Sequence, residues 1–120
     1  MRVYLDNCCF NRPYDDQTFE TIRLETEAKL FVQESIRLKR ASLIWSFMLD
    51  LENGDHPDSD VRESIAEWKL LSKTSVDPEE AVRKSALNLV SEKGIKSKDA
   101  LHLAAAVQAK ADYFLTTDRE

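Results

Sequence analysis

The chain has 120 residues, of which 42% are hydrophobic and 32% are charged, and its formal net charge is −5. A chain of this length can bury a core of its own, so we expect residues 1–120 to form a single domain. Only 2 glycines and 3 prolines argue against an all-β fold with many tight turns. The acidic balance excludes a protein that holds nucleic acid by a basic surface alone.

The sequence contains no apolar run that approaches the roughly 18 residues needed to span a membrane. The N-terminus also lacks the apolar core of a signal peptide, so a cytoplasmic protein without a membrane partner is expected. Cys8 and Cys9 are adjacent and poorly placed for an ordinary disulfide. We interpret them as small buried hydrophobic residues, with a thiol metal site as the weaker alternative.

The first half of the chain alternates strand and helix patterns. Residues 3–5 form an apolar run typical of a buried strand, and residues 11–16 are rich in turn formers, which predicts a loop. Thr18 can cap a helix that extends to about residue 39. The apolar face predicted for this helix comprises Leu24, Ala28, Phe31, Ser35 and Leu38. Residues 42–45 predict a second strand, and residues 47–53 a short helix closed by Gly54.

The same alternation continues to the end of the chain. Val61, Ile65, Trp68 and Leu71 mark an amphipathic helix, and residues 73–76 a short strand. Asp77 is a predicted helix cap with proline at the next position, and Gly94 a predicted stop. A helix from Ser97 is apolar on nearly all sides, and residues 113–115 form a fourth strand. This order predicts an α/β protein, a three-layer α/β/α sandwich with a short parallel sheet of about four strands.

Four acidic residues are predicted to meet at one edge of that sheet. In a parallel α/β sheet, strand ends and the starts of the following helices share an edge. Asp6 and Asp118 follow strands, Asp99 begins a helix, and Glu52 lies within two turns of the second strand. Crowded carboxylates repel one another, and a divalent ion relieves that repulsion. The sequence therefore predicts a Mg²⁺ or Mn²⁺ site, for which phosphodiester hydrolysis is a natural chemistry.

Each acid also has a simpler interpretation. Asp6 followed by Asn7 can be local turn chemistry, and Asp99 suits the first turn of any helix. Asp50 competes with Glu52 for the same role, and Asp118 can be a surface residue. The hypothesis therefore depends on the four acids together. His102 lies three residues after Asp99, but a packed, hydrogen-bonded histidine is favoured over a catalytic one in this apolar helix.

Several residues are candidates for supporting roles. Asn7 and Thr117 flank two of the acids and can orient carboxylates or water, although they can equally satisfy local backbone groups. Arg12 is a candidate for phosphate or RNA binding. The basic residues that can supplement it are Arg23, Arg37, Lys39 and Arg40. A charged, solvated helix face is the commoner explanation for these four.

Four segments together resemble the PIN-domain family: VYLDNCC, SFMLDLEN, KDALHLAAA and FLTTD. The resemblance spans nearly the whole chain and implies a Mg²⁺- or Mn²⁺-dependent ribonuclease. It places catalytic, metal-binding roles on Asp6, Glu52, Asp99 and Asp118. Many bacterial and archaeal members resemble VapC-type toxins, which cleave RNA, form homodimers and are blocked by a small antitoxin. By this resemblance, RNA is the expected substrate, and a second copy and an antitoxin are the expected partners.

The sequence departs from the family pattern at two places. Asn7 stands where many such toxins have a small hydroxyl residue, and the chain stops two residues after Asp118, whereas family members usually continue into a further strand or helix. Either the chain is naturally short or a C-terminal piece is missing. Two other functions compete. One is a catalytically weak PIN-like module that binds RNA or protein, and the other is a phosphorylated receiver domain with an acidic Mg²⁺ site.

Overall fold

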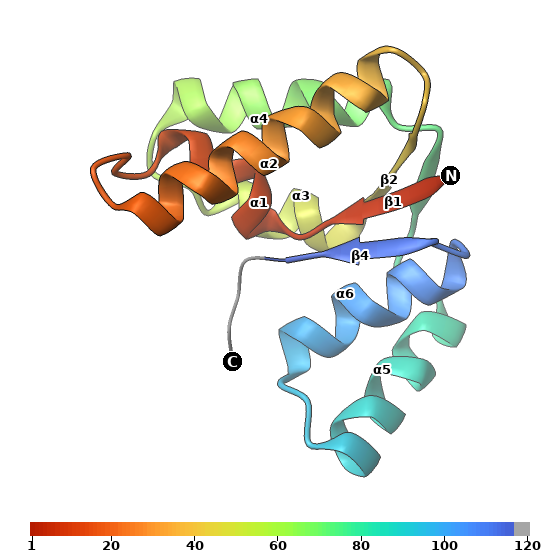
Figure 1. Ribbon diagram of the computed structural model, residues 1–120. Helices are drawn as coiled ribbons and strands as arrows, with labels where there is room; N and C mark the ends of the chain where they lie inside the picture. Colours follow the sequence, from red (N-terminus) through yellow and green to blue (C-terminus); the bar gives the residue numbers. More distant parts are fainter. Residues whose placement is uncertain (117–120) are drawn as a thin grey trace.

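The protein was analysed as a computed structural model, which describes residues 1–116 (Figure 1). Its sheet has four parallel strands in the order β3-β2-β1-β4. The strands are β1 (Arg2–Leu5), β2 (Ser42–Ser46), β3 (Thr74–Val76) and β4 (Tyr113–Leu115). Val3 of β1 is paired with Leu43 on one side and Tyr113 on the other, so β1 is central. The expected α/β class with a four-stranded parallel sheet is confirmed.

Helices cover both faces of this sheet, with α2 and α4 on one side and α5 and α6 on the other (Figure 1). The helices are α1 (Asn7–Asn11), the 3₁₀ helix η1 (Arg12–Tyr14), α2 (Glu20–Arg37), α3 (Phe47–Gly54), α4 (Ser59–Leu71), α5 (Glu80–Lys93) and α6 (Ser97–Gln108). The fold is therefore the predicted PIN-like three-layer sandwich. Its strand order differs from the 2-1-3-4-5 order of receiver domains, which argues against that alternative. Within residues 1–116, none of the helices combines the length and apolar character that a membrane crossing requires.

The central strands are buried because both faces are covered, as is usual for parallel sheets. Tyr4 of β1 is fully buried and stacks on Phe114 of β4, with ring centroids 5.3 Å apart. Phe10 and Trp45 pack together on the core, with centroids 5.4 Å apart. Alanines on α6 are almost wholly buried, and their small side chains let that helix approach the sheet closely. The core thus fixes the end of β1, which Asp6 directly follows.

The loop predicted at residues 11–16 is wrong, because α1 and η1 occupy most of it. Asp6 is the N-cap of α1, where its side chain accepts a hydrogen bond from the backbone N–H of Asn7. Pro13 lies in the first turn of η1, where its missing N–H removes no helical hydrogen bond. The turn-forming residues therefore build short helices rather than a loop.

The predicted start and buried face of α2 are also wrong. The helix begins at Glu20, because Thr18 donates from both its N–H and its hydroxyl to Asp16 instead of capping the helix. Leu24, Phe31 and Leu38 of the predicted apolar face are 54%, 74% and 53% exposed. The residues of α2 that are buried are Thr26, Lys29, Gln33 and Ile36. Thr26 donates to the carbonyl of Arg12 and Lys29 packs on aromatic rings, so specific contacts decide the docking face.

The N-terminal end of α5 differs from the prediction, whereas its C-terminal end agrees with it. The N-cap is Glu79 rather than the predicted Asp77. The carbonyl of Asp77 accepts from the N–H of Glu79 over 2.8 Å in a tight turn, and the first helical bond runs from the N–H of Arg83 to the carbonyl of Glu79. Gly94 ends the helix as predicted, in the left-handed conformation with φ of 67°, which glycine adopts without steric penalty.

Candidate metal centre

A cleft of about 780 Å³ opens at the carboxyl ends of the strands. Its walls come from the turn after β1, the start of α2, the helix α3 and the first turns of α6. Asp6, Glu52 and Asp99 all line it. Three acids separated widely in sequence therefore meet at one edge of the sheet, as the strand and helix pattern predicts.

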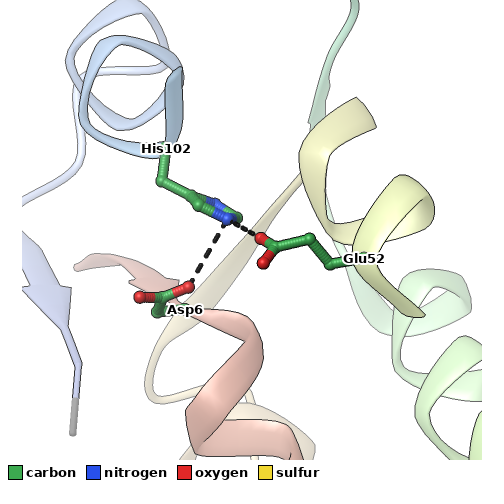
Figure 2. Close-up of side chains that lie close together, drawn as sticks. All are labelled: Asp6, Glu52 and His102. Carbon is green, nitrogen blue, oxygen red and sulfur yellow. Dashed lines mark hydrogen bonds and ion pairs between the residues drawn. The ribbon is translucent and has the colours of Figure 1, made fainter. Parts of the chain in front are cut away.

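The tightest group in this cleft consists of Asp6, Glu52 and His102, which each offer one donor atom within 4.8 Å of the others (Figure 2). His102 Nε2 is hydrogen-bonded to Glu52 Oε1 and lies 3.5 Å from Asp6 Oδ1. The His102 side chain is 2% exposed, and those of Asp6 and Glu52 are 11% and 24% exposed. Two carboxylates thus face one imidazole nitrogen at the inner end of the cleft.

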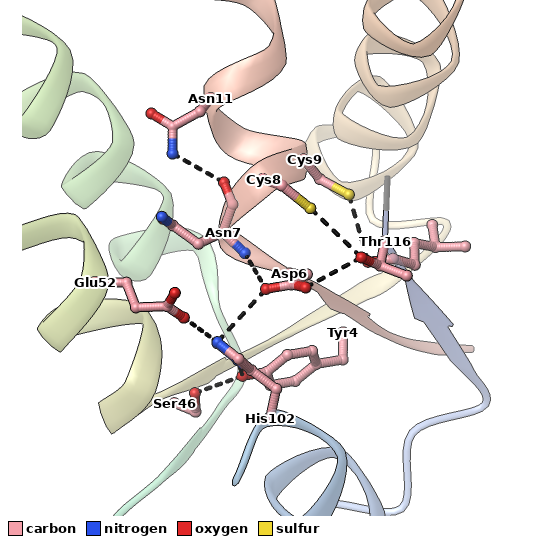
Figure 3. A network of polar contacts seen from close by, with 11 residues as sticks. Tyr4, Asp6, Asn7, Cys8, Cys9, Asn11, Ser46, Glu52, His102 and Thr116 are labelled. Atoms are coloured by element: carbon pink, nitrogen blue, oxygen red, sulfur yellow. Dashed lines mark hydrogen bonds and ion pairs between the residues drawn. The ribbon is translucent and has the colours of Figure 1, made fainter. Parts of the chain in front are cut away.

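The other nitrogen of His102 contacts a buried chain of hydroxyl groups (Figure 3). Tyr4 Oη lies 2.5 Å from His102 Nδ1 and 2.6 Å from Ser46 Oγ. Burial raises the pKa of Tyr4, so its phenol stays protonated. The expectation of a packed, hydrogen-bonded His102 is confirmed. Its ring also faces the two acids, which sequence reasoning did not predict.

Asp6 is held by donors on both of its carboxylate oxygens. The backbone N–H of Asn7 donates to Oδ1 over 2.7 Å, and the hydroxyl of Thr116 donates to Oδ2 over 3.1 Å. Sequence reasoning named Thr117, which lies outside the described residues, and missed Thr116. The position of Thr116 in the sequence could have identified it, because this residue directly follows β4 at the edge where β1 also ends.

Asp50 and Glu52 project to different sides of α3. Residues two apart on a helix differ by about 200° in direction. Asp50 accepts hydrogen bonds from Trp45 Nε1 and Lys69 Nζ, each over 3.0 Å, whereas Glu52 faces the cleft. Of these two acids, Glu52 therefore lines the cleft and Asp50 is engaged elsewhere.

Asp99 and Asp118 are the other two acids that the sequence predicted for this site. Asp99 is partly buried in the first turn of α6 and lines the cleft, but the compact three-residue group found among residues 1–116 does not include it. Asp118 lies outside the described residues. The compact group therefore contains two of the four predicted acids, with a third on the wall of the same cleft.

The basic residues around the cleft are Arg12, which the sequence suggested, and two lysines that it did not. Arg12 lines the cleft, but its guanidinium donates to Glu25 over 2.7 Å and to Asp15 over 2.8 Å, and these acids raise its pKa. The basic residues at the end of α2 lie about 20 Å along the helix from the cleft-lining Ile22, given a rise of about 1.5 Å per residue. Lys96 and Lys98, which sequence reasoning missed, line the cleft beside the start of α6.

The two cysteines lie apart from the compact group of ligands. Cys9 is buried as predicted, and its thiol donates to the carbonyl of Leu115 over 3.4 Å. A hydrogen bond with Cys8, together with burial, raises the pKa of the Cys9 thiol, which stays protonated. Cys8 is only half-buried and lines the cleft. Neither cysteine belongs to the three-residue group, so the thiol alternative gains no support.

The donors present in the cleft fit a divalent cation. Carboxylate oxygens and an unprotonated imidazole nitrogen are ordinary ligands of such ions in proteins. The side-chain Oδ1 of Asn7, which also lines the cleft, is buried and has no hydrogen-bond partner among the described residues. A hydrated ion in the cleft would supply what this acceptor lacks, because water bound to a metal is a strong hydrogen-bond donor.

The fold and this site define an α/β protein with an acidic, histidine-containing cleft. No family model matches the sequence, and neither does any curated protein. A similar solved structure is that of VapBC2 from Rickettsia felis bound to a DNA fragment from their promoter. One of its chains superimposes with a TM-score of 0.58 at 15% identity, over 98% of this chain and 89% of that chain. At this identity, the likeness is one of fold.

Proposed function

We propose that this protein is a divalent-metal-dependent endoribonuclease that hydrolyses RNA phosphodiester bonds with Mg²⁺ or Mn²⁺. The observation that carries the proposal is the meeting of Asp6 and Glu52 with a third donor, all within 4.8 Å, in a cleft that Asp99 also lines. The PIN-like fold supports the same function, because these acids match the family's motifs. Asp118 is the remaining acid of the proposed set, on sequence grounds.

The proposed roles of the side chains follow from their contacts. Asp6 and Glu52 would hold the ion, assisted by Asp99. When bound, a divalent ion activates water and offsets the negative charge that develops on the phosphate. Thr116 and the backbone of Asn7 fix both oxygens of Asp6, so this carboxylate needs little reorganisation to bind.

The approach of RNA is assigned to the basic side chains on the cleft wall. Lys96 and Lys98 lie beside the acids and would contact phosphates on either side of the bond to be cut. Arg12 remains a candidate, but part of its charge is already offset by Glu25 and Asp15. A protein with a net charge of −5 would depend on such a local basic edge to attract RNA.

We further propose that the protein acts as the toxin of a toxin–antitoxin pair, as a homodimer with a small antitoxin partner. The similarity to VapBC2 supports a partner protein. Two exposed apolar side chains support it as well, since Phe31 of α2 and Tyr113 of β4 are each more than half exposed and line the same groove. Exposed apolar side chains of this size commonly mark protein–protein contacts when they cluster.

A catalytically weak PIN-like module is the second candidate. It is favoured by the pairing of Glu52 with His102 and of Arg12 with two acids, which occupies groups that an active nuclease would use on metal and RNA. Such a module would bind RNA or a protein partner with its acids serving only to stabilise the fold. It predicts binding without cleavage under every metal condition.

The deciding experiment incubates purified protein with single-stranded and structured RNA in Mn²⁺, Mg²⁺ or EDTA. We expect cleavage with metal and none with EDTA, and we expect Asp6→Asn, Glu52→Gln and Asp99→Asn each to abolish it. Asp50→Asn is the matched control for Glu52→Gln, because Asp50 lies on the same helix but contacts Trp45 and Lys69. Cleavage that survives both Asp6→Asn and Asp99→Asn would indicate a contaminating nuclease or a different site.

A further inference from the structure

We infer that His102 is a nitrogen ligand of this metal site and makes it prefer first-row transition ions over Mg²⁺. The inference rests on the metal site of the proposed function and adds a selectivity to it. Mg²⁺ prefers an all-oxygen shell that retains water, whereas transition ions accept imidazole readily. A site of two carboxylates and one imidazole should therefore bind Mn²⁺ or Co²⁺ better than Mg²⁺.

The position of the imidazole supports a ligand role. His102 Nε2 lies 3.5 Å from Asp6 Oδ1 and is hydrogen-bonded to Glu52. Ligand atoms bound at about 2.1 Å to one ion lie roughly 3 Å apart when they occupy neighbouring positions. The three donors are thus close to a spacing that one ion can bridge. A histidine that served only to fill the core would need no carboxylates on its Nε2 side.

Without an ion, the tautomer with its proton on Nε2 fits these contacts, because that N–H can donate to the carboxylate oxygen of Glu52. A neutral imidazole then has an unprotonated Nδ1, which accepts from the hydroxyl of Tyr4. Ser46 in turn donates to Tyr4. Every hydrogen bond in this buried chain is then satisfied.

With an ion bound to Nε2, the donor and acceptor of each hydrogen bond in this series can exchange roles. Nδ1 carries the proton and donates to Tyr4, and Tyr4 donates to Ser46. Both hydroxyl groups can serve as donor or acceptor, so His102, Tyr4 and Ser46 each keep a hydrogen bond within the chain when the tautomer changes. Tyr4 and Ser46 are fully buried, and water does not compete for these bonds. Tyr4 is therefore the positioning residue that orients His102, as carboxylates or carbonyls do for many metal-binding histidines.

The first test measures metal affinity by calorimetry on the full chain without RNA. We expect His102→Gln to weaken Co²⁺ and Mn²⁺ binding at least tenfold and Mg²⁺ binding less than threefold. His56→Gln is the matched control, since His56 is the only other histidine and lies in the turn before α4. Equal losses for Mg²⁺ and Co²⁺, or no loss for either, would overturn the inference.

The second test detects the nitrogen directly in the unaltered protein, so it does not depend on a substitution in the core. Pulsed EPR of Mn²⁺ bound to the unaltered protein should show coupling to a ¹⁴N nucleus. In ¹⁵N NMR, Zn²⁺ should convert His102 from the Nε2–H to the Nδ1–H tautomer and leave His56 unchanged. Tyr4→Phe keeps the imidazole but removes its hydroxyl partner, so it should weaken Co²⁺ binding about tenfold. Absence of both spectroscopic changes in metal-loaded protein would refute the role of His102.

These readouts separate the inference from the proposed function. Nitrogen coordination in a protein that never cleaves RNA would leave His102 a ligand and overturn the nuclease proposal. Cleavage of RNA with Mg²⁺ in a protein that shows no nitrogen coupling would support the nuclease proposal and overturn the role of His102 as a ligand.

Discussion

Thr116 donates its hydroxyl to Asp6 Oδ2 over 3.1 Å and so joins the end of β4 to the end of β1. The other oxygen of Asp6 caps α1 through the N–H of Asn7. The Asp6 carboxylate therefore links the ends of β1 and β4, caps α1 and belongs to the candidate metal centre. Its orientation is set by two donors that are independent of any ion.

Replacing Thr116 with valine keeps the shape of the side chain and removes the hydroxyl, which donates to Asp6 over 3.1 Å and also contacts the Cys8 thiol over 3.5 Å. We expect about a tenfold loss of metal affinity and a similar loss of RNA cleavage, because the carboxylate is then less well oriented. Calorimetry and a cleavage assay at saturating metal would separate the two effects. Thr74→Val on β3 is the control. An unchanged metal affinity in Thr116→Val would show that this hydrogen bond is only structural.

Metal should stabilise the folded protein, since binding to the folded state relieves repulsion between Asp6 and Glu52. At 100 times the dissociation constant, the gain is about 2.7 kcal/mol, which appears as an upward shift of the melting temperature. Asp6→Asn keeps a cap for α1, because asparagine is as good an N-cap as aspartate. This variant should fold and melt normally without metal, yet show no shift at millimolar Mn²⁺. An equal shift in both proteins would place the ion elsewhere.

Lys98 should contribute to RNA affinity without taking part in the chemistry. We expect Lys98→Ala to weaken RNA binding severalfold and to lower the slope of log K against log salt by about 1 or less, as for one lost phosphate contact. Fluorescence anisotropy with a labelled RNA in EDTA measures this without cleavage. Lys84→Ala changes an exposed lysine on α5 away from the cleft and should have no effect. Equal effects of both substitutions would mean that only net charge matters.

Lys29 should make stability rise with pH over a defined window. It is buried against Phe10 and Trp68, with Nζ 5.3 and 5.7 Å from the ring centroids, and burial lowers its pKa to about 8 from 10.5. Below about pH 8, both folded and unfolded chains hold the proton and the folded state bears the full desolvation penalty. Between about 8 and 10.5, only the unfolded chain retains the proton, so stability increases with pH.

Lys29→Met removes this penalty and should stabilise the protein by about 2 kcal/mol at pH 7. The difference between variant and parent should shrink by more than half at pH 10, as measured by urea unfolding. Using the difference cancels the other groups that titrate at high pH. The exposed Lys84→Met serves as the control and should show no such dependence. A difference that is constant across this range would mean that Lys29 is not desolvated.

Phe31 tests the proposed self-association. It is 74% exposed, so Phe31→Ser should change the free energy of unfolding by less than about 0.5 kcal/mol. If α2 forms a contact between copies, the same change should raise the dimer dissociation constant at least tenfold in analytical ultracentrifugation. Leu70→Ser on α4, also highly exposed, is the control. A dimer unaffected by Phe31→Ser would place the contact on another surface.

The fold was predictable because strand and helix patterns are local. Residues 3–5 and 113–115 are short apolar runs, and both prove to be strands. The buried face of α2 was not predictable in this way. Its outward face is the more apolar one, and its inward face is selected by Thr26 and Lys29 through contacts with residues that are distant in sequence. Periodicity reports where apolar residues lie, and it does not report which face docks.

The candidate site was predictable to the level of the sheet edge. The rule for parallel sheets brought Asp6, Glu52 and Asp99 to one cleft, but it contained no information on side-chain direction. His102 was predicted as a core residue, and burial statistics were correct about its packing. They could not predict which groups contact His102 Nε2, because those neighbours depend on how α3 and α6 pack together. The missing information was the direction in which each side chain points from its helix, rather than its position in the sequence.

The central place of β1 in the sheet has a consequence for synthesis on the ribosome. β1 emerges first, but its partner β4 and the ligand-bearing helix α6 are made about 100 residues later, at roughly 5–20 residues per second. A nascent chain lacks His102 and Thr116, so the cleft remains unassembled during translation. If the protein cleaves RNA, it can do so only after α6 and β4 have been made.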